Sequence, residues 1–564
     1  MTGISRDGLH MTSLSTPSLL LWATLGCALY TTPAFSSKFD NKTFTEVQTL
    51  ANQNDAEAQN ALGDRYYDGE DVKQDYQQAI SWYQKAAEQG NPDAQYSLGY
   101  MFDKGKSVQQ DYAQAVIWYT KAAERGDAWA QTNLAYLYET GKGVPQDYAQ
   151  ARVWYTKAAE QNHSRAQTNL GDLYYDGNSV PQDYAQAKVW YIKAAEQNYA
   201  RAQANLGYLY ENGKGVPQDY TQAAVWYTKA AEQENATAQN NLGRLYEKGK
   251  GVQQDYAQAL AWYTKAAEQE DADAQTNLGY LYQNGKGVPQ DYSQARVWYT
   301  KAAEQNHARA QNNLGDLYYN GNGVPQDYTQ ARVWYIKAVE QNYARAQTNL
   351  GYLYENGKGV PQDYSQALAW YTKAAAQEDA DAQTNLGYLY ETGKGVQQNY
   401  AQAIAWYRKA SEQGQFHAQY NLGVAYDKGK GVKKDPVQAV IWYTKSAEQG
   451  YAWAQFNLGV VYYNGQGVKK DNTQAIAWYT KAAEQNLPNA QYNLGLMYYE
   501  GEGVPQDNTL AHTWFSIALA NGKSEAYQKV MTLTLKMQPE ELLKSHNKLT
   551  EFREKFSIPD PVIP

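Results

Sequence analysis

Residues 200–235 read ARAQANLGYLYENGKGVPQDYTQAAVWYTKAAEQEN, and this stretch returns with small changes every 36 residues. An Ala-Gln-x-x-Leu signature marks each of thirteen copies, with no insertion or deletion between them. A fixed period of this length predicts a solenoid, in which each unit buries its apolar face against its neighbours. The signature leucines are Leu62, Leu98, Leu134, Leu170, Leu206, Leu242, Leu278, Leu314, Leu350, Leu386, Leu422, Leu458 and Leu494.

The quoted copy contains two amphipathic helices. Apolar residues at helical spacing predict a first helix over residues 200–211, which ends where Gly213 supplies a left-handed residue. A second helix is expected to start at Asp219, which with Gln222 fits a capping box. The sequence therefore predicts an all-α chain of helix-turn-helix repeats.

Three periodic series are assigned to the fold rather than to a ligand. Trp226 and Tyr227 represent an aromatic series that we place in the buried stripe of the second helix. Gly207 and Ala223 are small and are expected to let the two helices approach closely. Asn205 represents an asparagine series that we interpret as hydrogen bonding the connection between repeats, since buried polar groups need partners.

Composition excludes several classes of function. The net charge of −9 and pI of about 5.4 argue against a nucleic-acid binder, which normally carries a basic patch. The mean hydropathy of −0.76 alone would suggest disorder, but 14% aromatic residues on a strict period do not fit disorder. Cys27 is the only cysteine, and the six histidines have no metal-ligand spacing. We therefore expect no disulfide, no metal and no cofactor.

The N-terminus resembles a signal peptide. Residues 19–30 form an apolar run that is too short to span a bilayer comfortably, and small residues follow it. We predict that residues 1–36 are a signal peptide, which makes the protein exported and periplasmic, or alternatively extracellular or envelope-attached. An uncleaved anchoring segment is the competing interpretation, and Cys27 matches a lipid-attachment pattern poorly.

The pattern Ala-x-x-x-Leu-Gly-x-x-Tyr-x-x-Gly-x-Gly-Val-x-x-Asp-x-x-x-Ala-x-x-Trp-Tyr-x-x-Ala-Ala resembles the Sel-1-like repeat family, a relative of the tetratricopeptide repeats. The resemblance implies a right-handed α-α superhelical solenoid that acts as a scaffold or adaptor for protein complexes. Exported members resemble proteins implicated in envelope assembly, signalling and host-cell interaction, and a few are described as binding penicillin-like compounds. Ala135 departs from the signature glycine, and Asp71, Ser107 and Ser179 replace the second loop glycine.

Specificity has to come from positions at which the repeats differ. By analogy with tetratricopeptide arrays, the first helix lines a concave groove, with outward slots five and two residues before the signature leucine and two and five after it. Aromatic and arginine side chains dominate interface hot spots. We predict that a protein partner contacts Trp129, Arg165, Arg201, Tyr208, Arg309, Arg345, Tyr352 and Trp453. The alternative is that each arginine only pairs with a carboxylate such as Glu211 or Asp172, and that the two tryptophans pack on neighbouring helices.

A longer period of 144 residues is also present, because residues 163–176 closely match residues 307–320. The groove is therefore expected to contain two similar binding faces. Its C-terminal end turns apolar, which marks an interaction site unless the C-terminal segment covers it. The residues that make it apolar are Tyr420, Val424, Phe456, Val460, Tyr492 and Leu496.

The expected organisation is a signal peptide over residues 1–36, an N-terminal cap over 37–50, the solenoid over 51–522, and a helical C-terminal cap and tail over 523–564. Pro539 is expected to open the last helix, and Leu542, Leu543, Leu549 and Phe552 to cover the last repeat. We expect a monomeric, non-enzymatic scaffold for protein partners, without stable membrane insertion of the mature chain. The competing functions are a cell-wall-related or penicillin-binding enzyme or small-molecule binder, and a carbohydrate-binding groove.

Overall fold

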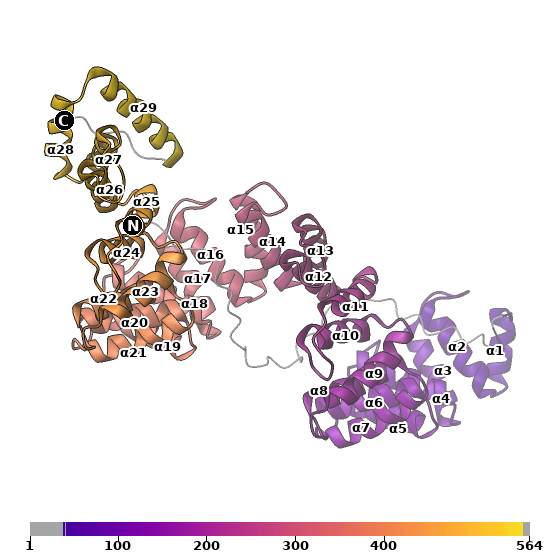
Figure 1. The fold of residues 1–564 in the computed structure, drawn as a ribbon. Helices are drawn as coiled ribbons and strands as arrows, with labels where there is room; N and C mark the ends of the chain where they lie inside the picture. Colours follow the sequence, from indigo (N-terminus) through magenta and orange to yellow (C-terminus); the bar gives the residue numbers. More distant parts are fainter. Residues whose placement is uncertain (1–37, 40, 557–564) are drawn as a thin grey trace. The chain divides into compact units, whose positions relative to one another are not determined.

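The computed structural model describes residues 38–39 and 41–556; the expected signal peptide and the tail after residue 556 lie outside this range. The described residues form 29 helices and no strand, as predicted. They divide into two compact units, the first ending at Gln305 and the second beginning at Asn306. Within each unit, consecutive helices pack as hairpins that follow one another along the chain (Figure 1).

Each of the thirteen repeats contains a first or A helix and a second or B helix, numbered here as repeats 1 to 13. The A helices are α2 (Ala56–Asp68), α4 (Pro92–Lys104), α6 (Ala128–Thr140), α8 (Ser164–Asp176), α10 (Ala200–Asn212), α12 (Ala236–Lys248), α14 (Ala272–Asn284), α16 (Ala308–Asn320), α18 (Ala344–Asn356), α20 (Ala380–Thr392), α22 (Phe416–Lys428), α24 (Ala452–Asn464) and α26 (Pro488–Glu500). The B helices are α3 (Tyr76–Glu88), α5 (Tyr112–Glu124), α7 (Tyr148–Glu160), α9 (Tyr184–Glu196), α11 (Tyr220–Glu232), α13 (Tyr256–Glu268), α15 (Tyr292–Glu304), α17 (Tyr328–Glu340), α19 (Tyr364–Ala376), α21 (Tyr400–Glu412), α23 (Pro436–Glu448), α25 (Asn472–Glu484) and α27 (Asn508–Ala520). Helix α1 (Phe44–Asn52) precedes them, and α28 (Ala526–Lys536) and α29 (Pro539–Phe556) follow.

The turn inside each repeat forms as the sequence predicts, except for its capping box. Gly213 ends α10 with φ 66°, the left-handed conformation that glycine adopts without steric cost. The carboxylate of Asp219 caps α11 by accepting the backbone N–H groups of Thr221 and Gln222 at 2.9 and 3.0 Å. The backbone N–H of Asp219 donates instead to the carbonyl of Tyr210 at 2.9 Å, so it is not available for the reciprocal bond of a capping box.

The centre of each repeat is the tyrosine of the B helix rather than its tryptophan. Tyr227 is fully buried, whereas the neighbouring Trp226 is half-buried and carries the ammonium of Lys229 4.4 Å above its ring. The placement of the tryptophan series in the core is therefore only partly right. A Cβ at Gly207 would lie 2.5 Å from Cδ1 of Tyr227, so the signature glycine makes room for this ring as well as for the partner helix.

A buried glutamine, in addition to the predicted asparagine series, bonds the connection between repeats. Gln203 is buried; its amide donates to the carbonyl of Ala195 at 3.4 Å, and its oxygen accepts from Gln233 at 2.7 Å. One buried amide thus joins the B helices of repeats 4 and 5, which explains why the signature contains Gln. The second loop glycine also serves inter-repeat packing, because a Cβ at Gly215 would lie 2.7 Å from the carbonyl oxygen of Tyr184 in the preceding repeat.

Both ends of the array carry additional helices. Thr43 and Glu46 form a capping box at the start of α1, whose Val47 is buried against repeat 1. Helix α29 begins at Pro539, as expected, and packs against α27, where the rings of Trp514 and Phe552 lie 5.0 Å apart. The expectation that Leu543 covers the last repeat is wrong, since 62% of it is exposed.

Candidate functional site

The A helices present the predicted site residues, on a surface that we call the A-helix face. It consists of the slots five and two residues before the signature leucine and two and five residues after it. Buried tyrosines of the B helices hold the acidic side chains of this face by hydrogen bonds. The hydroxyl of Tyr227 donates to Glu211 at 2.8 Å, and that of Tyr191 donates to Asp172 at 2.7 Å. Equivalent bonds join Tyr83 to Asp64, Tyr155 to Glu139, Tyr263 to Glu247, Tyr335 to Asp316, Tyr371 to Glu355 and Tyr407 to Glu391.

The acid partner comes from one of two slots. In most repeats it lies five residues after the signature leucine, as Glu211 does. In repeats 1, 4 and 8 it lies two residues after the leucine, and a tyrosine takes the fifth position. Because either slot reaches the same hydroxyl, the exchange leaves the core unchanged and alters only the outer surface.

Arg201 of repeat 5 contacts polar side chains of repeat 4. Its Nη2 lies 2.5 Å from Oδ2 of Asp172, and its Nη1 donates to Asn169 at 3.0 Å. Arg165, one repeat earlier in the same slot, donates to Asn133 at 3.3 Å. The asparagine series therefore forms hydrogen bonds from one repeat to the next, as predicted, and these bonds lie between the A helices. Half of the Arg201 side chain remains exposed.

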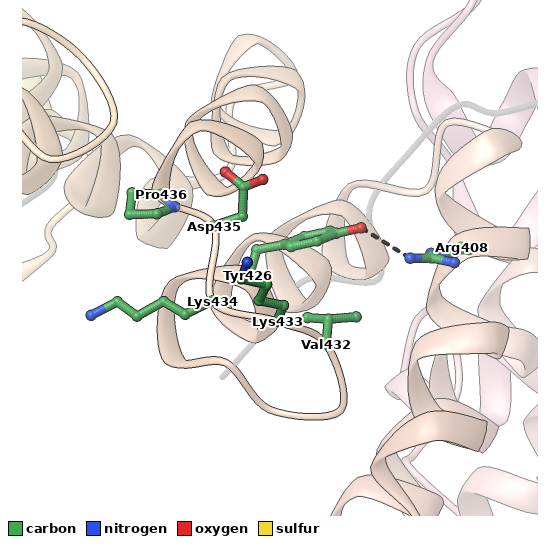
Figure 2. Close-up of a pocket in the computed structure, with 7 residues that line it drawn as sticks. All are labelled: Arg408, Tyr426, Val432, Lys433, Lys434, Asp435 and Pro436. Carbon is green, nitrogen blue, oxygen red and sulfur yellow. Dashed lines mark hydrogen bonds between the residues drawn. The ribbon is translucent and has the colours of Figure 1, made fainter.

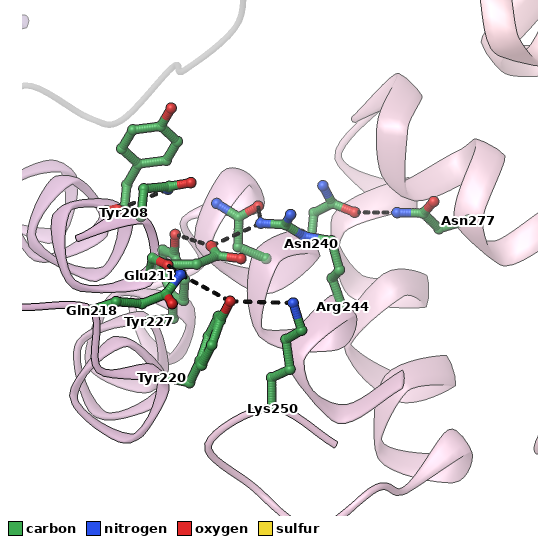
Figure 3. A network of polar contacts seen from close by, with 11 residues as sticks. Tyr208, Glu211, Gln218, Tyr220, Tyr227, Asn240, Arg244, Lys250 and Asn277 are labelled. Carbon is green, nitrogen blue, oxygen red and sulfur yellow. Dashed lines mark hydrogen bonds and ion pairs between the residues drawn. The ribbon is translucent and has the colours of Figure 1, made fainter. Parts of the chain in front are cut away.

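Glu211, considered as a partner of Arg201, pairs with Arg244 instead. Figure 3 shows Glu211 between Tyr227 and Arg244, with the arginine donating to the carboxylate at 2.8 Å. A buried carboxylate is costly unless it is paired and hydrogen bonded, and here both conditions hold. The ion pair links repeats 5 and 6 and is part of the fold.

The second arginine pair lies in the second unit. Arg309 is half-buried and Arg345 is exposed. Partial desolvation of its guanidinium by the surrounding protein would lower the pKa of Arg345, but attraction by Asp381 and Asp316 raises it. Burial raises the pKa of Asp316 to about 6, against the opposing effects of the Tyr335 hydroxyl and Arg345.

Tyr208 and Tyr352 occupy equivalent aromatic clusters. Tyr208 is 40% exposed, and its ring lies 6.2 Å from that of Tyr175. Lys214 donates to the Tyr175 hydroxyl at 2.5 Å and lies within 5.4 Å of three tyrosine rings. Such placements are favourable cation–π contacts.

The second cluster repeats this arrangement 144 residues later. Tyr352 is also 40% exposed, and its ring lies 6.1 Å from that of Tyr319. Lys358 donates to the Tyr319 hydroxyl at 2.6 Å. The longer period in the sequence thus corresponds to two like sets of side chains, one in each unit.

The two predicted tryptophan anchors differ. Trp129 is half-buried and packs edge-on against His163 at a ring distance of 4.4 Å, so it is packed on its neighbour as the alternative interpretation held. Trp453 is 42% exposed and contacts Phe456 only edge-on at 6.4 Å. Of the two, Trp453 has the larger surface to offer a partner.

The C-terminal cap covers only part of the apolar strip. Tyr492 and Leu496 pack against a buried cluster that includes Leu533 of α28 and Met537, the residue after this helix. Val424 and Tyr420 pack instead within the cluster of repeats 11 and 12.

Sequence reasoning missed the acid partners and the tyrosines beside them, Tyr175 and Tyr319. The signal was nevertheless present, because the acid and the tyrosine exchange slots together in repeats 1, 4 and 8. Reading the two slots jointly would have shown that they share one function. Each slot read alone looks variable.

Residues 38–39 and 41–556 contain no cluster of three or more His, Cys, Asp or Glu side chains suited to a metal ion. Within the same part of the chain, no helix combines the length and apolar character needed to cross a bilayer.

The Sel1 repeat model matches the chain thirteen times in succession. The chain belongs to the Sel1 repeat family. The matched segments are residues 56–91, 92–127, 130–163, 164–199, 200–235, 236–271, 272–307, 308–343, 344–379, 380–415, 416–451, 454–487 and 488–523. Sel1 and tetratricopeptide-like solenoids are typical scaffolds for protein interaction and are generally non-enzymatic.

Two solved Sel1 structures are similar to this chain. One is a protective antigen present in uropathogenic Escherichia coli strains, with 41% identity and a TM-score of 0.58; the match covers 78% of this chain and 95% of that one. The other is a Sel1 repeat protein from Oxalobacter formigenes, with 34% identity and a TM-score of 0.44, covering 55% of this chain and 90% of that one. A comparison with curated proteins finds no match.

Proposed function

We propose that this Sel1 repeat protein is a non-enzymatic scaffold that binds a protein partner through two like patches of its A-helix face. The first patch contains Arg201, Tyr208 and the adjoining Tyr175. The second contains Arg345, Tyr352 and the adjoining Tyr319. The proposal is carried by one observation: three side chains recur 144 residues apart. These are the exposed tyrosine, the second tyrosine that packs against it, and the arginine.

The chemistry of each patch fits a peptide segment with acidic and aromatic residues. Arg201 has five N–H donors in a planar fork, and its terminal nitrogens engage Asp172 and Asn169 while half of the side chain stays exposed. Tyr208 adds a flat apolar surface that is already held by Tyr175 and Lys214. Pre-ordered aromatic and arginine side chains of this kind are typical binding hot spots.

A binding role accounts better than catalysis for the acidic side chains. Glu211 and Asp172 each accept a tyrosine hydroxyl and an arginine N–H, so their oxygens stabilise the fold. Solvent-exposed tyrosines also stack on sugar rings, and a carbohydrate ligand is therefore the alternative that the test has to separate.

We also propose that the protein is exported. The support is the apolar run over residues 19–30 with small residues after it, and the similarity to a protein described as a protective antigen. Cell fractionation should recover the chain outside the cytosol with its N-terminus at Ser37. Recovery of the full-length chain in the cytosol would remove this proposal.

The binding test compares exposed tyrosines in the same slot. Proteins captured from envelope extracts by the wild-type chain are purified, and their affinity is measured by calorimetry. The double variant Tyr208→Ala/Tyr352→Ala should weaken a true partner about tenfold or more, as the loss of hot-spot residues does. Tyr388→Ala is the matched control, because Tyr388 occupies the same slot with 38% exposure and lies outside both patches.

Three results would overturn the proposal. The first is a partner that binds the double variant and the wild type equally. The second is an equal loss of affinity in the Tyr388→Ala control. The third is a cell-wall glycan fragment that binds in a Tyr208- and Tyr352-dependent way while no protein does.

A further inference from the structure

The loops of repeats 11 and 12 depart from the structure that the other loops share. In eleven repeats, a loop glutamine donates its side-chain amide to a carbonyl in the last turn of the A helix; Gln218, for example, donates to Glu211 at 2.8 Å. Lys434 and Lys470 take the place of this glutamine in repeats 11 and 12. In these two repeats a lysine charge therefore replaces the hydrogen bond that the glutamine forms in the others.

Further positive charges replace neutral residues around the same place. Lys433 and Lys469 stand where most repeats have proline or glutamine, and Arg408 stands where most repeats have threonine. Residues 401–481 contain ten Lys and Arg residues against five Asp and Glu residues, although the whole chain has a net charge of −9. The charge of this segment thus has the opposite sign from that of the protein.

The two lysine pairs lie on loops that are packed together. A Cβ at Gly467, in the loop of repeat 12, would collide with the carbonyl oxygen of Pro436, the first residue of α23, which lies two residues after Lys434. All four lysines are exposed. Lys470 lies 5.0 Å from the ring of Tyr463, and none of the four forms an ion pair in the described part of the chain.

A pocket lies beside the loop of repeat 11, and Lys433 and Lys434 are among the residues that line it. Arg408 donates to the hydroxyl of Tyr426 at 3.0 Å and forms one wall, while Val432 and Pro436 form apolar walls (Figure 2). Asp435 faces the same pocket, but its carboxylate accepts the backbone N–H groups of Val437 and Gln438 as the cap of α23. Figure 2 shows the Lys434 side chain extending away from the loop.

Exposed apolar residues continue the surface along α23. Val437 is 54% exposed and Ile441 is 41% exposed, one helical turn apart. The position of Val437 carries a small or polar residue in the other repeats. A surface that joins lysines to exposed aliphatic side chains complements a peptide in which acidic and aliphatic residues are mixed.

We propose that the loops of repeats 11 and 12, with Arg408 and the exposed side of α23, form a docking surface for an acidic, leucine-containing segment of a partner protein. This surface is separate from the two patches of the A-helix face. Glutamate carboxylates of the segment engage Lys434 and Lys470, and its aliphatic side chains pack on Val437 and Ile441. The departures from the shared loop follow from this role, because local structural rules are broken most often at functional sites.

The test restores the shared loop residues. The double variant Lys434→Gln/Lys470→Gln returns the glutamine that eleven other repeats use, so it should fold and melt at or above the wild-type temperature. The probe is a short labelled peptide in which Glu alternates with Leu, and its affinity is measured by fluorescence anisotropy in the full chain. The variant should bind it about tenfold more weakly, and the wild-type affinity should fall with added salt.

A matched control separates the site from net charge. Lys157→Gln/Lys193→Gln removes the same two charges from lysines that stack on Trp154 and Trp190, and it should leave the affinity within about twofold. The proposal fails if both double variants lose affinity equally, if a peptide with Gln in place of Glu binds as well, or if the wild type shows no binding. It also fails if the binding of phosphatidylglycerol vesicles or heparin requires Lys434 and Lys470 while the binding of the peptide does not.

Discussion

Arg201 of repeat 5 and Asp172 of repeat 4 form an ion pair across a repeat boundary, with Nη2 2.5 Å from Oδ2. Asp172 is only 15% exposed at its side chain and also accepts the Tyr191 hydroxyl. We predict that Arg201→Ala lowers the free energy of unfolding by about 1 kcal/mol, because it leaves a largely buried carboxylate without its counter-ion. Amide exchange should show the loss in repeats 4 and 5 first, since coupling in solenoids is between neighbours.

A double-mutant cycle controls this prediction. Asp172→Asn keeps the shape of the side chain and needs no counter-ion, so Arg201→Ala should cost less in that background. Strictly additive effects of the two substitutions would show that the ion pair does not couple the repeats.

The two aromatic residues of the B helix should differ in their effects on stability. Tyr227→Ala is expected to cost about 3–5 kcal/mol, as a fully buried large-to-small change does. Trp226→Ala should cost about 2 kcal/mol, because the half-buried tryptophan keeps one face under Lys229 and loses less contact with the protein. Urea unfolding followed by amide exchange measures both. An equal or larger cost for Trp226→Ala would contradict the central position that the structure gives to Tyr227.

Asp64 should make stability depend on pH. Burial is the main reason that the pKa of this carboxyl is raised to about 7, and Asp68 and Asp93 add repulsion. The folded pKa exceeds the unfolded value of about 4. The contribution of Asp64 to stability is therefore fully present below about pH 4 and is lost as the pH rises through about 7.

Asp64→Asn tests this directly. Asparagine can still accept the Tyr83 hydroxyl but carries no charge. The variant should match the wild type near pH 4 and exceed it near pH 8, by roughly 1.4 kcal/mol for each unit of pKa shift. Parallel stability curves for the two proteins from pH 4 to pH 8 would contradict the raised pKa.

Glu234 stores backbone strain at the connection between repeats 5 and 6. Its φ is 61°, in the left-handed region, where the equivalent Gly90 and Gly126 sit without steric cost. Glu234→Gly should therefore raise the free energy of unfolding by about 1 kcal/mol, as estimated from the left-handed penalty less the extra freedom of glycine in the unfolded chain. Thermal and urea unfolding measure the gain. Asn198→Gly is the control and should gain less, because asparagine tolerates this conformation better.

Period and turn chemistry in the sequence were enough to determine the array of helix pairs. Gly213 ends one helix and Asp219 begins the next because of local backbone preferences, which depend on nearby residues only. The 144-residue block was equally visible, because duplication copies side chains as well as folds. The exchange of slots between Asp172 and Glu211 was visible too, but its meaning depends on a tyrosine hydroxyl in another helix.

Only the tertiary structure decided which side chains meet across helices and between repeats. Tyr227 rather than Trp226 fills the centre, because the ring that faces the signature glycine is set by how two helices pack. Arg201 meets Asp172 while Arg244 takes Glu211, because the register between adjacent repeats selects the partner among several carboxylates on neighbouring turns. The exposure of Trp453 and the packing of Trp129 on His163 follow from the same cause. Local sequence fixes backbone conformation, whereas ion pairs and exposure depend on distances that exist only after the repeats have stacked.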